Sequence, residues 1–486
     1  MSEPVSRNRI LSSLIWVYLE NIAAQLVSFI VSIVLARLLN PSDYGTIALV
    51  SIFINIANVF VTSSFSFSLV QKRDSDELDY NTIFWFNLAM SVIIYVILFL
   101  IAPLVANYYD KQIVTVLLRV LALRIPLSAI NSIQLAYVSN KMVFKKSFIT
   151  NSGGAVISGF IGILLAALGV GIWALVAQTI TNVIFSTLLM AIVVQWRPRF
   201  EFSMERLRRL LGFGWKLLVT GLMFAVYNEL RALVIGKRYS ADDLGYYDKG
   251  YSFPKLIGAN IDTTITRVLF PTLSKSQDDS AQLIAATRRA SKTSAFIMTP
   301  ILFGLAIIAE PLVRVLLTEK WLPCVPYLQV MCLVWWLQPT QSCSIQGIKA
   351  IGRSDLYLYI ELISKCVGVL LIVVTVSLFN SPFAIAVSML IGQVIAVLIY
   401  GAFVSRYIGY TIRQQLFDLL VPGLISAFMC VAIYYLGLFI SNSILSMIVQ
   451  VTVGGCIYIF ISELFKIEEY VYLKKMIVSG VKKLKQ

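Results

Sequence analysis

The sequence predicts an all-α polytopic membrane protein with about fourteen transmembrane helices, and three observations lead to this prediction. Hydrophobic residues make up 58% of the 486 positions and charged residues only 13%, whereas a soluble domain carries about 25% charged residues. The apolar residues come in blocks of about twenty, the length that a helix needs to cross about 30 Å of hydrocarbon. The basic residues lie in short segments between these blocks, which argues against a nucleic-acid partner despite a net charge of +15.

The apolar blocks give the individual spans in order. The basic segment Ser6–Arg9 precedes a block that is too long for a signal peptide, so we expect a retained first helix. The fourth and eighth spans are the least apolar of the set. The predicted limits are 12–36, 45–68, 82–106, 114–138, 149–168, 172–195, 212–235, 245–272, 292–316, 324–349, 357–379, 383–404, 417–440 and 443–463.

Lysines and arginines are concentrated in alternate loops, and this asymmetry predicts the orientation. The opposite set of loops holds only Arg37, Lys111, Lys237, Arg238 and Lys320. Because basic loops stay in the cytoplasm, we expect both termini to be cytoplasmic and every outer loop to be short.

The chain repeats itself after about two hundred residues. Arg37–Gly45 (RLLNPSDYG) is echoed by Lys237–Gly245 (KRYSADDLG), and the APLV motif that begins at Ala102 recurs as the EPLV motif that begins at Glu310. Six spans separate the copies, so both begin on the same side of the membrane. This pattern predicts parallel repeats with the substrate site between the halves.

The repeat divides the chain into predicted domains. Two six-helix lobes are followed by two C-terminal helices and a basic cytoplasmic tail. The predicted limits are 1–196 for the N-terminal lobe, 197–211 for a linker, 212–404 for the C-terminal lobe, 405–465 for the two further helices and 466–486 for the tail.

The linker has an amphipathic pattern. Leu207, Leu210 and Leu211 fall on one helical face, with arginines opposite. We interpret it as a helix that lies on the anionic cytoplasmic leaflet. It would serve either as the link on which the lobes rock or as a basic topology anchor.

Charged and amide residues inside the apolar blocks are the candidate functional groups, because a charge in hydrocarbon costs at least about 2.5–3.5 kcal/mol. In the eighth span, Asp248, Lys255 and Asp262 are spaced by seven and share one helical face, which predicts a cavity lining. The candidates for substrate binding in a central cavity are Lys255, Arg231, Arg267, Arg119, Arg124, Gln338 and Gln341, and those for ion coupling are Glu20, Glu229 and Asp262. Guanidinium and amide groups suit phosphate oxygens and sugar hydroxyls.

Some of these charges have a structural alternative. Glu361 and Lys365 form an i,i+4 pair in the favourable order, which favours a structural salt bridge. Arg267 and Arg314 lie near span ends and could either face the cavity or extend to the membrane surface. Arg119 lies within a turn or two of the outer face.

Cysteine and histidine usage predicts neither a metal site nor a cofactor. The six cysteines fall almost entirely inside apolar blocks without CxxC spacing, and the chain contains no histidine. The lack of the usual general base also argues against an enzyme.

Several segments resemble the Wzx-type polysaccharide flippases, in the branch that includes colanic and teichuronic acid exporters, within the multidrug/oligosaccharidyl-lipid/polysaccharide exporter superfamily. They are Leu35–Gly45, Leu69–Lys72, Phe84–Asn87 (FWFN), Asn260–Asp279 (NIDTTITRVLFPTLSKSQDD) and Glu319–Trp321 (EKW). The likeness runs in order from the first span to about the twelfth.

The resemblance implies two six-helix lobes around a V-shaped cavity, with two extra helices. The implied substrate is an undecaprenyl-pyrophosphate-linked oligosaccharide repeat unit, flipped outward across a bacterial inner membrane to supply O-antigen, capsule or exopolysaccharide. A proton or sodium gradient would drive export without a cofactor. Membrane lipid, a polysaccharide polymerase and a chain-length regulator are the other implied partners. The alternatives are a multidrug exporter of the same fold, a polymerase or ligase of the same pathway, and a non-transporting scaffold.

Overall fold

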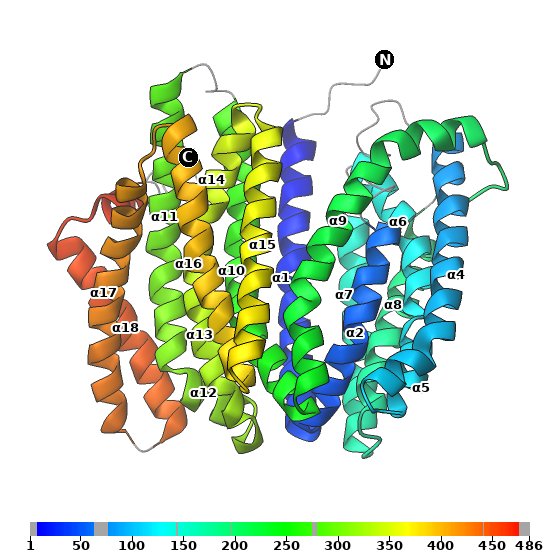
Figure 1. The fold of residues 1–486 in the computed structure, drawn as a ribbon, viewed down its shortest axis with the longest axis horizontal. Helices are drawn as coiled ribbons and strands as arrows, with labels where there is room; N and C mark the ends of the chain where they lie inside the picture. The colour runs from blue at the N-terminus through cyan, green and yellow to red at the C-terminus, as the bar shows by residue number, and fades with distance from the viewer. Residues whose placement is uncertain are drawn as a thin grey trace. The chain divides into compact units, whose positions relative to one another are not determined.

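A computed structural model describes residues 7–62, 76–141, 144–194, 196–274, 279–440 and 442–475. All regular secondary structure in these ranges is helical (Figure 1). The chain forms two compact units, the N-terminal unit Met1–Gly245 and the C-terminal unit Tyr246–Gln486.

Long helices make up the N-terminal unit, and short loops join most of them. In chain order they are α1 (Arg7–Leu38), α2 (Pro41–Thr62), α4 (Glu77–Tyr108), α5 (Ile113–Leu121), α6 (Arg124–Lys141), α7 (Phe144–Ala167), α8 (Trp173–Val193) and α9 (Met204–Arg238). The first residues of α10 (Ala241–Ser274) also belong to this unit.

The C-terminal unit contains the rest of α10 and a second set of helices. They are α11 (Ser280–Ile307), α12 (Ala309–Leu316), a 3-10 helix (Glu319–Cys324), α13 (Val325–Trp336), α14 (Gln338–Ala350), α15 (Ser354–Leu378), α16 (Pro382–Tyr407), α17 (Ile412–Leu438) and α18 (Ser443–Leu464). In this unit α14, α15 and α16 pack against one another (Figure 1).

Eleven helical segments among the described residues are long and apolar enough to cross a membrane. They match eleven of the predicted spans in order, which confirms an all-α polytopic membrane protein.

The other three predicted spans differ from the eleven for physical reasons. In the first, 12–36, the described apolar part is only Ala23–Leu38. In the eighth, 245–272, helix α10 carries several charged residues. The tenth, 324–349, is divided at Leu337 into α13 and α14, because Pro339 in the first turn of α14 has no N–H to donate to the preceding turn. A total of fourteen spans stays a prediction.

The two copies of the sequence repeat have the same local structure. The backbone N–H of Asn40 donates to Oδ2 of Asp43 at 3.1 Å, and the N–H of Ser240 donates to Oδ2 of Asp243 at 3.1 Å. Each aspartate is the third residue of its helix, from which a carboxylate binds the backbone of the capping residue. The sequence repeat is therefore also a structural repeat at the starts of α2 and α10.

These two helix starts approach each other very closely within the N-terminal unit. A Cβ atom at Gly45 would lie 1.7 Å from the carbonyl oxygen of Ala241, and one at Gly245 would lie 2.2 Å from the carbonyl oxygen of Pro41. Backbone atoms cannot swing aside as the end of a flexible side chain can. Both positions therefore require glycine.

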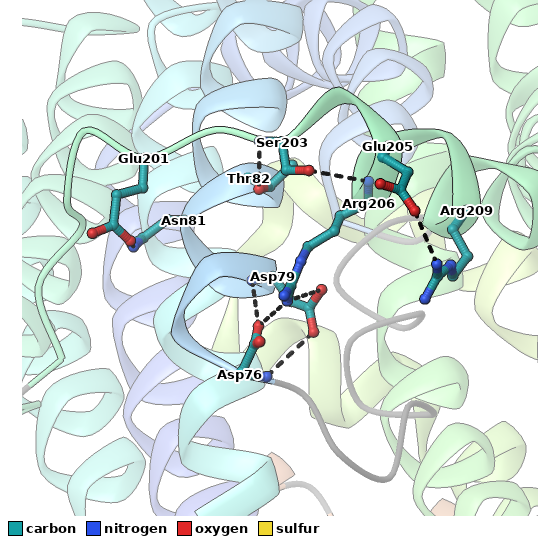
Figure 2. Close-up of polar contacts among 9 residues, drawn as sticks. All are labelled: Asp76, Asp79, Asn81, Thr82, Glu201, Ser203, Glu205, Arg206 and Arg209. Carbon is teal, nitrogen blue, oxygen red and sulfur yellow. Dashed lines mark hydrogen bonds and ion pairs between the residues drawn. The ribbon is translucent and has the colours of Figure 1, made fainter.

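An ion-pair cluster joins the start of α9 to the start of α4 (Figure 2). Asp76 caps α4 in a reciprocal capping box with Asp79. The Arg206 guanidinium contacts the carboxylates of both aspartates and lies 3.2 Å from Asp79. The Asp79 side chain is fully buried, so Arg206 supplies the countercharge that a buried carboxylate needs.

Further hydrogen bonds hold the segment between α8 and α9 against α4. The backbone N–H of Arg199 donates to Oδ1 of Asn81 at 3.0 Å, and that of Ser203 donates to Oγ1 of Thr82 at 3.2 Å. The Trp85 indole donates to the Arg199 carbonyl at 2.8 Å. We call this arrangement, together with the Arg206 ion pairs, the linker clamp.

The linker clamp changes the interpretation of the amphipathic segment. Residues 204–211 are the first turns of α9, which continues unbroken to Arg238. Leu207 and Leu210 are buried in a cluster with aromatic residues of α4, including Tyr80 and Phe84. The apolar face predicted to lie on lipid thus packs on protein.

Replacing Arg206 with glutamine is expected to lower the melting temperature of the purified protein by a few degrees, because buried Asp79 loses its countercharge. Arg206→Gln is compared with Arg208→Gln, an exposed neighbour on the same helix. Thermal unfolding in detergent measures the effect, and equal melting temperatures for the two variants would contradict it.

The stability difference should depend on pH. The hydrogen bond from Arg206 lowers the pKa of Asp76. The contribution of this pair is therefore present above the ordinary aspartate pKa of about 3.9 and is lost as the pH falls through the lowered folded-state value. Melting curves at several pH values should show the gap between wild type and Arg206→Gln closing only in this acidic range.

Candidate functional site

Two broken spans occupy corresponding positions in the repeats. In the N-terminal unit α5 ends at Leu121 and α6 begins at Arg124, and in the C-terminal unit α13 ends at Trp336 and α14 begins at Gln338. Interrupted helices at matching positions of two repeats are the best pointer to a transporter binding site. The second segment of each pair, α6 or α14, carries the polar residues.

In the C-terminal unit, a glutamine from α16 joins two glutamines of α14. Nε2 of Gln393 donates to Oε1 of Gln341 at 2.8 Å and to Oε1 of Gln338 at 3.1 Å. Gln341 is buried and Gln338 partly so. Three amide groups are thus held together between the short helix α14 and the membrane-spanning helix α16.

Asp262 of α10 belongs to the same network. The Ser342 hydroxyl donates to Oδ1 of Asp262, and Nε2 of Gln338 donates to the Ser342 oxygen at 3.3 Å. The structure therefore brings together Asp262, Gln338 and Gln341, which the sequence predicted separately. We call these three residues with Ser342 and Gln393 the amide network.

A second polar group lies in the same unit, between α15 and α16. The Tyr400 hydroxyl, fully buried, donates to Oε1 of Glu361. Nζ of Lys365 lies 3.7 Å from Oε2 of Glu361, which confirms the predicted i,i+4 ion pair. Lys365 lies near one carboxylate oxygen of Glu361, and the Tyr400 hydroxyl donates a hydrogen bond to the other.

Replacing Tyr400 with phenylalanine is expected to destabilise the protein by about 1.5–3 kcal/mol, the usual value of a hydrogen bond to a charged group. Glu361 is buried and would lose this donor. Tyr407→Phe, at the exposed end of the same helix, is the matched control. Thermal unfolding of both variants measures the difference, and a Tyr400→Phe protein as stable as the control would show that the bond contributes nothing.

The predicted polar stripe of α10 lies on a face that the protein leaves uncovered. Asp248 and Lys255 are exposed and Asp262 is half-buried. The opposite face is packed, and there Lys249 is buried with its Nζ 5.8 Å from the centroid of the Trp321 ring. The stripe is therefore available to a ligand.

In the N-terminal unit, α6 carries buried polar atoms without hydrogen-bond partners among the described residues. They are Nε of Arg124, Oδ1 of Asn131 and Oε1 of Gln134. Their spacing places them on one side of the helix. Because nearly all buried polar atoms in folded proteins are paired, this group of atoms makes α6 a candidate for contact with a polar ligand.

Helix α9 holds two further candidates. Arg231 is only 4% exposed, its guanidinium carbon lies 5.5 Å from the centroid of the Tyr227 ring, and its Nε has no hydrogen-bond partner among the described residues. Oε1 of Glu229 accepts a hydrogen bond from Nδ2 of Asn55 at 3.0 Å, which joins α9 to α2.

The remaining candidates lie apart from these groups or outside the described side chains. Arg119 packs on α4, where its Nε donates to the Phe99 carbonyl at 3.2 Å and its guanidinium lies 4.1 Å from the ring centroid. Arg314 is ion-paired with Glu319 at 2.8 Å. The side chains of Glu20 and Arg267 lie outside the part of the chain that the structure describes.

Sequence reasoning missed Gln393 and Tyr400. Both lie in the apolar block 383–404, where attention to charges alone passes over a single amide and a single phenol. The cost of placing an unpaired polar group in hydrocarbon applies to them as well, so a lone glutamine in the middle of such a block was the available signal.

Comparison with known sequences finds proteins of polysaccharide biosynthesis. The family model described as a polysaccharide biosynthesis protein matches residues 34–326. The succinoglycan biosynthesis transport protein ExoT of Rhizobium meliloti is 24% identical over 466 residues, which cover 94% of this chain and 93% of ExoT. The teichuronic acid biosynthesis protein TuaB of Bacillus subtilis is 23% identical over 362 residues, which cover 73% of this chain and 74% of TuaB.

A solved structure shares the fold. The lipid II flippase MurJ, in an inward closed conformation, matches with a TM-score of 0.75 and 18% sequence identity, over 94% of this chain and 98% of MurJ. At this identity the likeness establishes the fold alone.

Proposed function

Because this chain belongs to the polysaccharide biosynthesis protein family, we propose that it is a flippase that moves a lipid-linked sugar repeat unit across a bacterial inner membrane. The chain is a Wzx-like membrane transport protein of polysaccharide biosynthesis, and it is not an enzyme.

The proposed substrate is an undecaprenyl-pyrophosphate carrying one oligosaccharide repeat. The observation that carries this proposal is the pair of broken spans, in which α6 and α14 bring amide and guanidinium groups into otherwise apolar units. Amides form the paired hydrogen bonds that sugar hydroxyls need, and guanidinium groups bind phosphate. The names of two relatives support a polysaccharide-related substrate, since they refer to succinoglycan and teichuronic acid biosynthesis.

Each candidate residue has a proposed role. The cationic residues Lys255, Arg231, Arg124, Arg119 and Arg267 would neutralise pyrophosphate or acidic sugars, while Gln338 and Gln341 would bind sugar hydroxyls. Asp262 is the candidate ion-coupling carboxylate that the geometry supports best, because its hydrogen bond to Ser342 links it to the amide network. Glu229 and Glu20 are the other candidates for this role.

The proposed architecture has fourteen spans, with two six-helix lobes in residues 1–196 and 212–404. The lobes would alternate between inward-open and outward-open states, driven by a proton or sodium gradient. Both termini would be cytoplasmic. A polymerase and a chain-length regulator would use the exported repeat units.

The test is mass spectrometry of lipid-linked oligosaccharides in a strain that lacks the gene and has lost its surface glycan. We expect one undecaprenyl-pyrophosphate repeat unit to accumulate in the cytoplasmic leaflet, where an impermeant glycan-modifying reagent added outside cannot reach it. A plasmid-borne copy of the gene should restore export and serves as the control.

Two outcomes would overturn the proposal. Accumulation in the outer leaflet would mean that the chain acts after flipping. Unchanged lipid-linked intermediates, with a new sensitivity to cationic drugs, would indicate a multidrug exporter.

A further inference from the structure

A basic cavity of about 540 Å³ lies at one end of the C-terminal unit, away from the amide network. The first turns of α11 form one wall, and the segment that follows α18 forms the other. Residues 468–475 of this segment are helical. A volume of this size is within the range of small-molecule sites, about 300–1,000 Å³.

The second wall is built by a sharp turn after α18. Lys466 has a positive φ of 47°, and the chain reverses there. Nζ of Lys474 lies 2.8 Å from Oε1 of Glu463, which holds the segment back against α18. The apolar side of the segment packs against a cluster that contains Phe296 of α11 and Tyr458 of α18. The Tyr458 hydroxyl donates to the Phe296 carbonyl at 2.9 Å.

Two cations of the α11 wall are held in place by carboxylates. Arg288 makes two hydrogen bonds to buried Asp418, at 2.7 and 2.9 Å. Nζ of Lys292 lies 2.7 Å from Glu468 and 2.6 Å from Glu469. The Lys292 pairs join the two walls, and the Arg288 pair holds α11 to Asp418 of α17, so the cavity is a built feature of this unit.

Three more cations line the cavity without such partners. Arg289, Lys466 and Lys475 form no ion pair with a described residue, and the Arg289 guanidinium lies 5.2 Å from the centroid of the Tyr472 ring. Glu468 and Glu469 line the same cavity and pair with Lys292, so the five cations of the lining outnumber its two carboxylates and leave a net positive charge that attracts an anion. The cavity therefore suits a compact anion such as phosphate, which both arginine and lysine bind.

Beyond the basic cavity, two exposed isoleucines continue the same face of α11. Arg289, Thr293, Ile297 and Ile301 are spaced by four and share one face of α11. Ile297 is 39% exposed and Ile301 is 43% exposed, and both lie in the span Ala281–Ile307. A ligand whose phosphate occupies the cavity would thus have an apolar surface beside it for hydrocarbon chains.

We propose that this cavity binds the phosphate head group of an anionic phospholipid. Arg289, Lys466 and Lys475 contact the phosphate oxygens, and the acyl chains lie along Ile297 and Ile301. Basic pockets at the ends of transmembrane helices bind lipid head groups in this way. A soluble phosphate compound has the same head-group chemistry, but it would leave Ile297 and Ile301 uncovered.

The test uses the purified full-length protein in mild detergent, with cardiolipin, phosphatidylglycerol or phosphatidylcholine added. Native mass spectrometry measures lipid retention. We expect both anionic lipids to be retained and phosphatidylcholine not to be. The double variant Arg289→Gln/Lys475→Gln should bind them about tenfold more weakly or worse, as expected for lost charge-assisted hydrogen bonds.

The matched control is Arg406→Gln/Arg413→Gln, which removes the same charge from exposed positions outside the cavity. Wild-type-like binding by the control supports the proposal. Equal weakening in the two double variants, or equal retention of phosphatidylcholine, would overturn it. Size-exclusion profiles verify folding, and the single variant Lys475→Gln replaces the double variant if that one does not fold.

Inorganic phosphate distinguishes the two sources of the head-group chemistry. We expect millimolar phosphate neither to raise the melting temperature nor to displace cardiolipin. Displacement would assign the cavity to a soluble phosphate compound and overturn the lipid proposal. None of these measurements depends on export. The lipid-binding proposal can therefore fail while the flippase function stands, and the flippase function can fail while the lipid-binding proposal stands.

Discussion

Replacing Gly45 with valine is expected to abolish export of the surface glycan. A Cβ at this position would lie 1.7 Å from the carbonyl oxygen of Ala241 and 2.9 Å from the backbone nitrogen of Gly245. Both are backbone atoms at the start of α10, so the starts of α2 and α10 would have to separate. An overpacked core typically loses about 1–3 kcal/mol of folding free energy. We expect Gly45→Val to lose more than this, because the atoms in the way are backbone atoms.

Surface glycan in a complemented deletion strain measures the effect, together with the amount and melting temperature of the protein. Gly455→Val is the matched control, because a Cβ at this helical glycine would meet nothing within 4 Å. If Gly45→Val exports as well as Gly455→Val, the close contact at these helix starts has no role in the transport cycle or in stability.

Replacing Asp262 with asparagine is expected to reduce export at least about tenfold while the protein remains folded. Asparagine keeps the size of the side chain but cannot carry a proton or bind a cation as a carboxylate does. It also loses the charge-assisted hydrogen bond from Ser342, and such bonds are worth about 1.5–3 kcal/mol. Because Asp262 joins α10 to α14 through the amide network, this loss acts at the centre of the proposed site.

Export by Asp262→Asn is compared with export by Asp355→Asn, which removes an exposed carboxylate at the start of α15. Asp262→Glu, which keeps the charge, should retain part of the activity. Normal export by Asp262→Asn, with its usual response to collapse of the proton gradient, would exclude Asp262 from ion coupling.

Much of the fold could be predicted from the sequence because membrane insertion imposes a simple rule on it. Each helix must be apolar over about twenty residues, and eleven segments obey the rule plainly. The rule fails where a helix carries charged residues or is interrupted. Helix α10 carries charged residues, and the span 324–349 is broken at Leu337. Neither therefore offers an unbroken apolar helix of about twenty residues.

The candidate site could be predicted only in part. Spacing placed Asp262, Gln338 and Gln341 inside the membrane, but their partners depend on contacts between helices that are far apart in sequence. Gln393 lies 52 residues beyond Gln341 and still donates to it. Tyr400 could not be predicted for a different reason. A tyrosine in an apolar block is normally interpreted as a core residue, and its role as a donor follows only from its contact with Glu361.

The linker clamp has a consequence for the biosynthesis of this chain. The ion-pair cluster around Asp79 is complete only when the ribosome has made Arg206, well after the helices α4 to α8 have been synthesised. Until then a buried carboxylate lacks its countercharge, so the N-terminal bundle can finish folding only once the next helix has begun to emerge. A cut at residue 196, made to express this protein in halves, would therefore separate the bundle from the arginine that completes it.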